Sequence, residues 1–90
     1  MQKRFALHIR GKVQGVWYRK STQDQAQALG LVGFVRNEPD GSAYAEIEGS
    51  PELLEQMVDW CRKGPDLARV DAVESSEMAC VGEQAFRIER

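Results

Sequence analysis

A hairpin signal in the middle of this 90-residue chain constrains its fold more than any other feature. Residues 37–41 have the sequence Asn-Glu-Pro-Asp-Gly, in which proline presets one backbone torsion and Asp-Gly closes a tight turn. A mostly apolar segment, residues 31–36, precedes the turn, and residues 42–49 alternate between small apolar and polar side chains. The two segments therefore predict neighbouring antiparallel strands. In the second strand, the side chains expected to face inward are Ala43, Ala45 and Ile47, and those expected to face outward are Tyr44, Glu46 and Glu48.

The first thirty residues predict a strand followed by a helix. Residues 4–10 alternate between apolar and polar side chains, which is the pattern of a strand with one buried face. Residues 21–24, Ser-Thr-Gln-Asp, are typical of a helix start, with Asp where Glu or Gln is usual. We therefore expect the helix to begin near Ser21 and to end at Gly30. The strand residues expected to share the inner face are Phe5, Leu7 and Ile9.

The strongest helix signal follows the hairpin. Ser50 is a good N-cap residue, Pro51 fits the first turn, and Glu52 lies near the positive end of the helix dipole. The helix should end at the Gly-Pro pair of residues 64–65. Two weaker strand patterns follow, at residues 67–75 and 86–88. The apolar stripe of this helix consists of Leu53, Leu54, Met57, Val58 and Cys61.

The predicted order of elements is β-α-β-β-α-β, with a fifth strand or a bulge near the end. This order is typical of the α+β class and of a ferredoxin-like sandwich, an antiparallel sheet that carries both helices on one face. The length is that of one domain, and no linker-like stretch divides the chain, so residues 1–90 are expected to form a single domain.

The charges of the chain are unevenly distributed. Residues 1–20 contain six Lys or Arg and no carboxylate, whereas residues 37–60 contain seven carboxylates and no Lys or Arg. The net charge of −2 argues against a protein that coats nucleic acid. The basic segment is a candidate anion site, although a solvated surface would have the same composition, and the acidic segment is expected to be a solvated face.

Metal binding and membrane insertion both lack a signal. Cys61 and Cys80 form no CxxC pair and the single histidine, His8, is far from both, so we expect no metal site and two free thiols. No apolar run approaches the ~18–20 residues of a membrane span, and the N-terminus does not resemble a signal peptide. The expected location is the cytoplasm, and without a visible interface stripe the expected state is a monomer.

The segment that joins the first strand to the first helix carries the clearest functional pattern. Residues 11–21 contain two glycines and lead into a helix N-terminus, where unpaired backbone N–H groups favour anions. Arg19 adds a planar fork that matches two phosphate oxygens. The segment is not a Walker A loop, because no Gly-Lys-Ser/Thr closes it.

Three blocks of sequence resemble one known family. Residues 11–19, Gly-Lys-Val-Gln-Gly-Val-Trp-Tyr-Arg, are similar to the acylphosphatase signature. Residues 33–37 with 40–42 resemble the second motif of that family, and residues 64–70 resemble a third pattern. Phe34 stands where Trp is frequent, a change expected to affect packing more than chemistry. The resemblance covers nearly the whole chain.

The resemblance implies an enzyme that hydrolyses the carboxyl–phosphate bond of acyl phosphates, releases inorganic phosphate and needs neither metal nor cofactor. It implies that Arg19 binds the phosphoryl group with backbone N–H groups, and that Asn37 orients the attacking water. Such a reaction needs little acid catalysis, because the leaving carboxylate is already stable. The phosphate-binding loop implied by the match consists of Gln14, Gly15, Val16, Trp17, Tyr18 and Arg19.

Other functions remain open on the residues alone. A non-catalytic acyl-phosphate or phosphate-binding module would have the same fold and loop. RNA-recognition domains share the fold order, but the open face here offers His8 and Tyr44 beside two glutamates, which is a poor surface for bases. A metal carrier of this fold would need a cysteine pair in the first loop. Similar domains also occur in a hydrogenase-maturation protein that handles carbamoyl phosphate.

Overall fold

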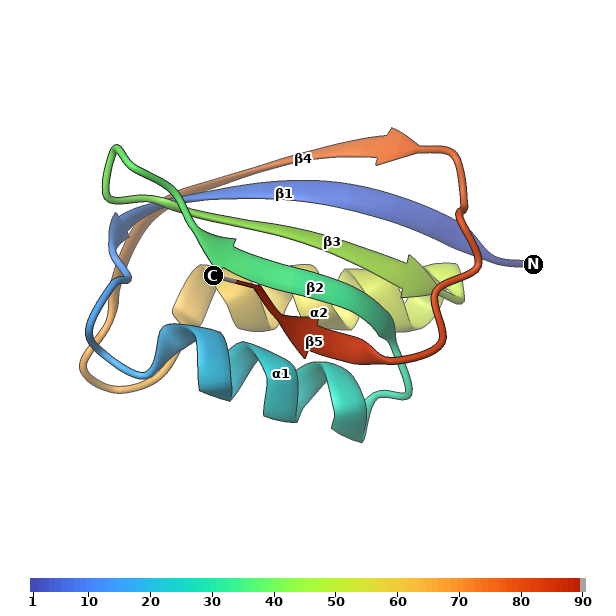
Figure 1. The fold of residues 1–90 in the computed structure, drawn as a ribbon, viewed down its shortest axis with the longest axis horizontal. Coiled ribbons are helices and arrows are strands. Elements are labelled where there is room, and N and C mark those ends of the chain that lie inside the picture. Colours follow the sequence, from blue (N-terminus) through green and yellow to red (C-terminus); the bar gives the residue numbers. More distant parts are fainter. Residues whose placement is uncertain (90) are drawn as a thin grey trace.

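A five-stranded sheet covered on one face by two helices forms the fold (Figure 1). The computed structural model describes residues 1–89. The sheet order is β4-β1-β3-β2-β5, with α1 packed against β2 and β5, and α2 against β1, β3 and β4. The elements in chain order are β1 (Lys3–Lys12), α1 (Tyr18–Ala28), β2 (Val32–Asn37), β3 (Ala43–Gly49), α2 (Pro51–Lys63), β4 (Arg69–Met78) and β5 (Phe86–Ile88).

This architecture confirms the predicted ferredoxin-like α+β fold. The hairpin prediction is confirmed as well, since β2 and β3 pair antiparallel on either side of the turn. One detail differs: β5 pairs parallel to β2, so the sheet is mixed and not wholly antiparallel. The short last strand returns along the free edge of β2 after a long connection from β4, and this path sets its direction.

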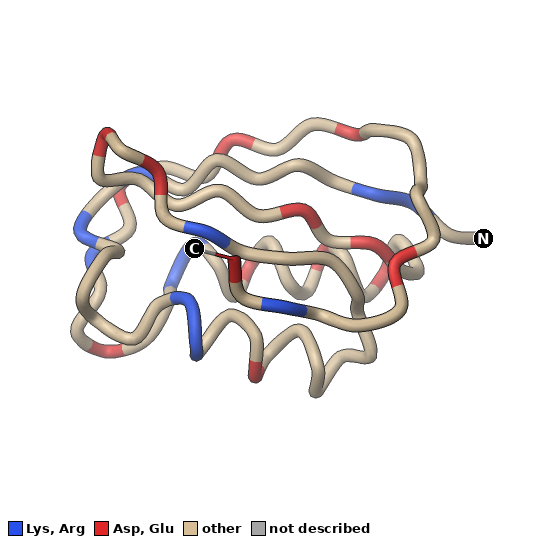
Figure 2. Tube along the Cα trace, viewed as in Figure 1, with Lys and Arg blue, Asp and Glu red and all other residues tan. Residues whose placement is uncertain are grey.

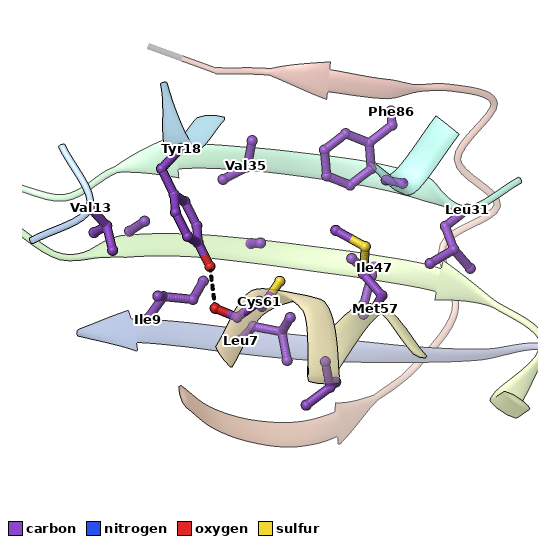
Figure 3. Close-up of a cluster of buried hydrophobic side chains, with 14 of the residues drawn as sticks. Leu7, Ile9, Val13, Tyr18, Leu31, Val35, Ile47, Met57, Cys61 and Phe86 are labelled. Atoms are coloured by element: carbon purple, nitrogen blue, oxygen red, sulfur yellow. Dashed lines mark hydrogen bonds between the residues drawn. The ribbon is translucent and has the colours of Figure 1, made fainter. Parts of the chain in front are cut away.

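The core lies between the sheet and the helices (Figure 3). Ala43, Ala45 and Ile47 are completely buried, as the alternation predicted. Small side chains on β3 let α2 pack closely on the middle of the sheet, where each apolar contact excludes water. Within the described residues, no helix is long and apolar enough to cross a membrane.

The first helix begins earlier than its sequence pattern predicts. It starts at Tyr18, so Ser21 lies inside the first turn and does not cap it. The Tyr18 side chain is buried, and its hydroxyl donates to the main-chain oxygen of Cys61 on α2 at 2.8 Å (Figure 3). This tertiary anchor, which a local pattern cannot reveal, sets the helix start. Ser50 does occupy the N-cap position of α2, but its side chain makes no capping hydrogen bond.

The fourth strand is displaced from its predicted range of 67–75. A register shift between Arg10 and Gly11 bends β1 against β4 and explains why the apolar residues of β4 do not alternate strictly. Gly11 has a φ of 136°, and a Cβ there would lie 2.1 Å from the main-chain oxygen of Arg69. Only glycine fits this bend, which directs the chain from β1 into the loop before α1.

The prediction that the acidic segment is a solvated face is wrong for two of its members. Glu46 and Glu48 lie on the outer side of β3, as predicted, but both pair with the buried guanidinium of Arg4 on β1. Glu48 also accepts hydrogen bonds from the main-chain N–H groups of Val81 and Gly82. The connection between β4 and β5 therefore covers this end of the sheet.

Candidate active site

A pocket of about 380 Å³ opens at the end of the sheet where β1 leads into α1 and β2 ends. Several of the Lys and Arg positions of the chain lie at this end of the fold (Figure 2). The pocket combines two basic side chains, a carboxamide and apolar groups from three parts of the sequence. Its lining residues are Val13, Gly15, Trp17, Tyr18, Arg19, Lys20, Asn37 and Ile88.

The loop before α1 presents unpaired main-chain amides. Among the described residues, no N–H group from Gln14 to Lys20 has a hydrogen-bond acceptor, and the first internal bond of α1 is donated by Ser21. The first turn of α1 contains no acidic side chain. These N–H groups and the positive end of the helix dipole are therefore available to an anion.

The loop is held in place by buried side chains. Val13, Val16 and Tyr18 are each buried in the core, while the residues between them turn the backbone outward. Gly15 and Trp17 both have positive φ angles, 72° and 64° respectively. Glycine accepts this conformation without strain, but for Trp17 it is unfavourable and must be enforced by the anchors on either side.

Arg19 lies in the first turn of α1 and lines the pocket. One of its guanidinium nitrogens, Nη1, donates to the main-chain oxygen of Glu89 at 3.3 Å, just beyond β5. None of the carboxylates in residues 1–89 forms an ion pair with it. Its charge is therefore not neutralised by the described part of the chain and can act on a bound anion.

Asn37 is the last residue of β2 and lines the same pocket. Its side-chain oxygen Oδ1 is buried and has no hydrogen-bond partner among the described residues. A buried acceptor without a partner costs about 1–3 kcal/mol, and such groups are retained where a ligand or water completes them. The oxygen lies out of reach of water in this structure, so it can accept a hydrogen bond from a water molecule in the pocket only after the side chain moves.

Gln14 connects the loop to the hairpin that follows Asn37. Its Nε2 group donates to the main-chain oxygens of Glu38 at 2.8 Å and of Ser42 at 3.0 Å. The turn between these residues is exposed, so it has few apolar contacts of its own. The Gln14 side chain therefore sets the distance between the unpaired amides and Asn37.

A second set of hydrogen bonds connects the hairpin to His8 on β1. The Ser42 hydroxyl lies 2.9 Å from Nε2 of His8 and also contacts the carboxylate of Asp40. Since Asp40 can only accept when ionised, Ser42 donates to it and His8 donates to Ser42. The Ser42 hydroxyl and its main-chain N–H hold the pKa of Asp40 below its usual range. His8 thus takes part in holding this turn.

The structure brings most of the predicted site residues together. Gly15, Trp17, Tyr18, Arg19 and Asn37 all line the pocket. Gln14 and Val16 do not: the first reaches the hairpin and the second is buried. The roles of these residues in binding and catalysis stay predictions.

Three lining residues were not among those predicted. Lys20 follows Arg19 directly and Val13 begins the loop, so adjacency in sequence was the signal available for both. Ile88 had no such signal, because only the parallel pairing of β5 with β2 brings it to the pocket.

The open face of the sheet does not offer free aromatic rings for bases. The guanidinium of Arg36 lies 4.8 Å from the ring centre of Tyr44, and that of Arg87 lies 5.2 Å from the ring centre of Phe34. The hydroxyl of Tyr44 donates to Glu46. Side chains of this protein therefore already cover both rings, which disfavours RNA binding on this face.

Comparison with known proteins gives a consistent result. The family model described as Acylphosphatase matches residues 5–88. An acylphosphatase of Methylococcus capsulatus is 48% identical over 81 residues, which cover 90% of this chain and 88% of the relative. An acylphosphatase of Thermococcus kodakarensis is 44% identical and covers 96% of this chain and 97% of its own length. The solved structure of an acylphosphatase from Coxiella burnetii superimposes with a TM-score of 0.95 at 28% identity, covering 98% of this chain and 93% of that chain. This chain belongs to the acylphosphatase family.

Proposed function

We propose that the pocket beside Arg19 and Asn37 is where this chain hydrolyses acyl phosphates to a carboxylate and inorganic phosphate, the reaction of its family. The observation that carries the assignment is the meeting, in one pocket, of an unneutralised arginine and a buried carboxamide oxygen without a partner. An anion site alone would need the first group but not the second. The two together suit a reaction in which a phosphoryl group and a water molecule meet.

Arg19 and the main-chain amides from Gln14 to Arg19 bind the phosphoryl oxygens. The guanidinium supplies two parallel N–H donors, and the amides at the start of α1 supply more, aided by the helix dipole. Charge on these oxygens is redistributed in the transition state, and donors fixed before the reaction stabilise it most effectively. The positive charge for the reaction thus comes from the chain itself, which is why we expect no metal or cofactor to be required.

Asn37 orients the water. Its Oδ1, which has no other partner, accepts one hydrogen bond from the water once the side chain has moved toward the pocket, and the water's lone pair is then directed at phosphorus. The water oxygen forms a bond to phosphorus while the bond from phosphorus to the acyl oxygen breaks, and the leaving carboxylate keeps that electron pair. The surplus proton of the water passes to solvent or to the phosphate product. No protein acid is needed, because the carboxylate leaves as a stable anion.

We also propose that residues 1–90 act as one domain, as a cytoplasmic monomer whose partners are an acyl phosphate and phosphate. The two cysteines support a reducing compartment, since Cys61 is buried, Cys80 is exposed and both are free thiols. Burial raises the pKa of the Cys61 thiol to about 12, which keeps it protonated and unreactive. Cell fractionation and the mass in solution by light scattering test these two assignments.

The direct test is hydrolysis of benzoyl phosphate by the wild-type chain, with and without a chelator. We expect turnover that the chelator does not reduce. Competition by inorganic phosphate should accompany it, because product and substrate share the Arg19 site. Saturable phosphate binding without any turnover would contradict the enzyme and indicate a binding module instead.

A further inference from the structure

The Trp17 side chain is not held by packing, although its buried neighbours hold its backbone. Its side chain is 74% exposed, although it occupies the N-cap position of the first helix of a folded domain. Of the described residues other than glycine, it alone has a positive φ, at 64°. Exposing a large aromatic ring and holding its backbone in the left-handed region are both unfavourable. Strained residues of this kind are found where a ligand is held.

The lining of the pocket leaves few groups for the acyl end of a substrate. Arg19 and the amides are assigned to phosphate, and Asn37 is assigned to water. Val13 and Tyr18 are each only 1% exposed, so they form a floor that offers little surface. The lining groups that remain are Trp17, Lys20 and Ile88.

Two of these three remaining groups are apolar. The Trp17 ring stands open to solvent on the loop, and the half-buried Ile88 comes from β5. The third, Lys20, is exposed and its ammonium is 3.0 Å from the carboxylate of Asp24, one helical turn onward. Its charge is therefore partly satisfied and less available to a second anionic group on the substrate.

We propose that Trp17, with Ile88, is the subsite for the acyl group, and that the preferred substrates are acyl phosphates with an apolar or aromatic acyl portion. This inference rests on the proposed function of the same pocket. An apolar acyl group that lies on the Trp17 ring removes apolar surface of both partners from water. A short acyl group such as acetyl covers little of the ring and gains little.

The test compares kcat/KM for benzoyl phosphate with kcat/KM for acetyl phosphate in two variants. Trp17→Asn removes the ring and keeps a residue that tolerates the left-handed backbone, whereas Trp17→Phe keeps an aromatic platform. We expect the benzoyl-to-acetyl ratio to fall about tenfold in Trp17→Asn and to stay within about threefold of wild type in Trp17→Phe. Leu67→Asn is the matched control, because Leu67 is 71% exposed but does not line the pocket; its ratio should not change.

A binding measurement tests the same acyl subsite without depending on turnover. Trp60→Phe leaves Trp17 as the single tryptophan, and the aromatic contact between residue 60 and Tyr18 is retained. We expect Trp17 fluorescence to change when phenacylphosphonate binds and to change much less with acetonylphosphonate or inorganic phosphate. Phenacylphosphonate should also bind several-fold more tightly than acetonylphosphonate.

The outcomes separate the two proposals. One outcome is that wild type hydrolyses both substrates while Trp17→Asn lowers both rates equally. The ring would then only support the loop, and the assignment of Trp17 to the acyl group would be wrong. A higher rate on succinyl phosphate than on benzoyl phosphate would likewise overturn it in favour of Lys20. If wild type hydrolyses neither substrate, the proposed function fails, and the phosphonate affinities then decide the apolar subsite by themselves.

Discussion

Two arginines at opposite ends of the sheet have opposite environments. Arg4 is 1% exposed and contacts the carboxylates of Glu46, Glu48 and Glu83. Arg19 lies in the pocket, donates to one main-chain oxygen and has no carboxylate partner in residues 1–89. Figure 2 shows the acidic positions of β3 close to the start of β1, away from the loop before α1. The chain therefore neutralises Arg4 at one end of the sheet and leaves Arg19, at the other end, without a carboxylate partner in residues 1–89.

The difference indicates what each charge is for. A buried charge surrounded by opposite charges holds segments together, since removing any one member leaves the others unsatisfied. A charge left beside unpaired amides raises the affinity of the site for an anion. Charges that stabilise the fold and charges that perform the reaction should thus be separable by mutation.

Removing Arg19 should affect activity far more than stability. We expect Arg19→Ala to lower kcat/KM for benzoyl phosphate about 1000-fold, equivalent to about 4 kcal/mol of transition-state stabilisation. Arg19→Lys should recover only part of this, because an ammonium cannot present two parallel donors. Steady-state kinetics and thermal unfolding of the same samples check both statements. A large fall in the melting temperature with little loss of activity would contradict this account, because it would show that Arg19 stabilises the fold and does not act in the reaction.

Removing Arg4 should have the opposite effect. We expect Arg4→Met to lower the free energy of unfolding by about 3 kcal/mol, or Tm by about 15 °C, because three carboxylates lose their contact with a buried positive charge. The kcat of the folded protein should stay within about twofold of wild type. The matched control is Arg10→Ala, which breaks an exposed pair with Glu74 and should cost less than about 1 kcal/mol. Equal losses in both variants would show that burial of the Arg4 cluster is unimportant.

A substitution of Gln14 tests whether catalysis depends on the hydrogen bonds between the loop before α1 and the hairpin. Gln14→Leu removes both hydrogen bonds to the hairpin and should lower kcat about tenfold, because Asn37 is then less well placed. The inhibition constant for phosphate should change little, since buried side chains hold the loop itself. Gln23→Leu, which removes a bond to the main-chain oxygen of Phe86 away from the pocket, is the control. Parallel losses of kcat and of phosphate affinity would mean that Gln14 orders the loop instead.

The carboxylate cluster around Arg4 should make the protein sensitive to acid. The main-chain N–H of Val81, followed by the Arg4 guanidinium, holds the pKa of Glu48 below its ordinary value. The stability that Glu48 contributes is therefore fully present above the unfolded pKa of about 4.3, and is lost as the pH falls through the lower pKa of the folded state. We expect Tm to fall more steeply below pH 4.5 in wild type than in Glu48→Gln. Equal slopes would contradict this.

Local patterns predicted most of the fold because the strands and the second helix each carry a complete signal in their own residues. Alternation placed Ala43, Ala45 and Ile47 in the core, and the Pro-Asp-Gly turn fixed the hairpin. Interactions between distant segments decided the rest. Tyr18 starts α1 three residues before Ser21 because its side chain reaches α2, and Glu48 is covered because a distant loop returns to it.

The candidate site, like the fold, was predictable where the signal lies in local sequence and not where it depends on contacts between distant segments. Sequence motifs identified Arg19 and Asn37 as candidates, and the structure brings both to one pocket. Ile88 and the hairpin contacts of Gln14 could not be predicted, because they depend on the pairing of β5 and on which side chain crosses from loop to hairpin. Polar contacts between loops leave no periodic pattern in a sequence.

Asn37→Ala tests the central claim most directly, since it should separate binding from chemistry within one pocket. Two quantities are measured in the same preparation: kcat for benzoyl phosphate and the competitive inhibition constant for inorganic phosphate. We expect kcat to fall about 100-fold while the inhibition constant stays within about twofold, because Arg19 and the amides remain intact. An unchanged kcat, or a loss of phosphate affinity as large as the loss of kcat, would contradict the assignment of Asn37 to water.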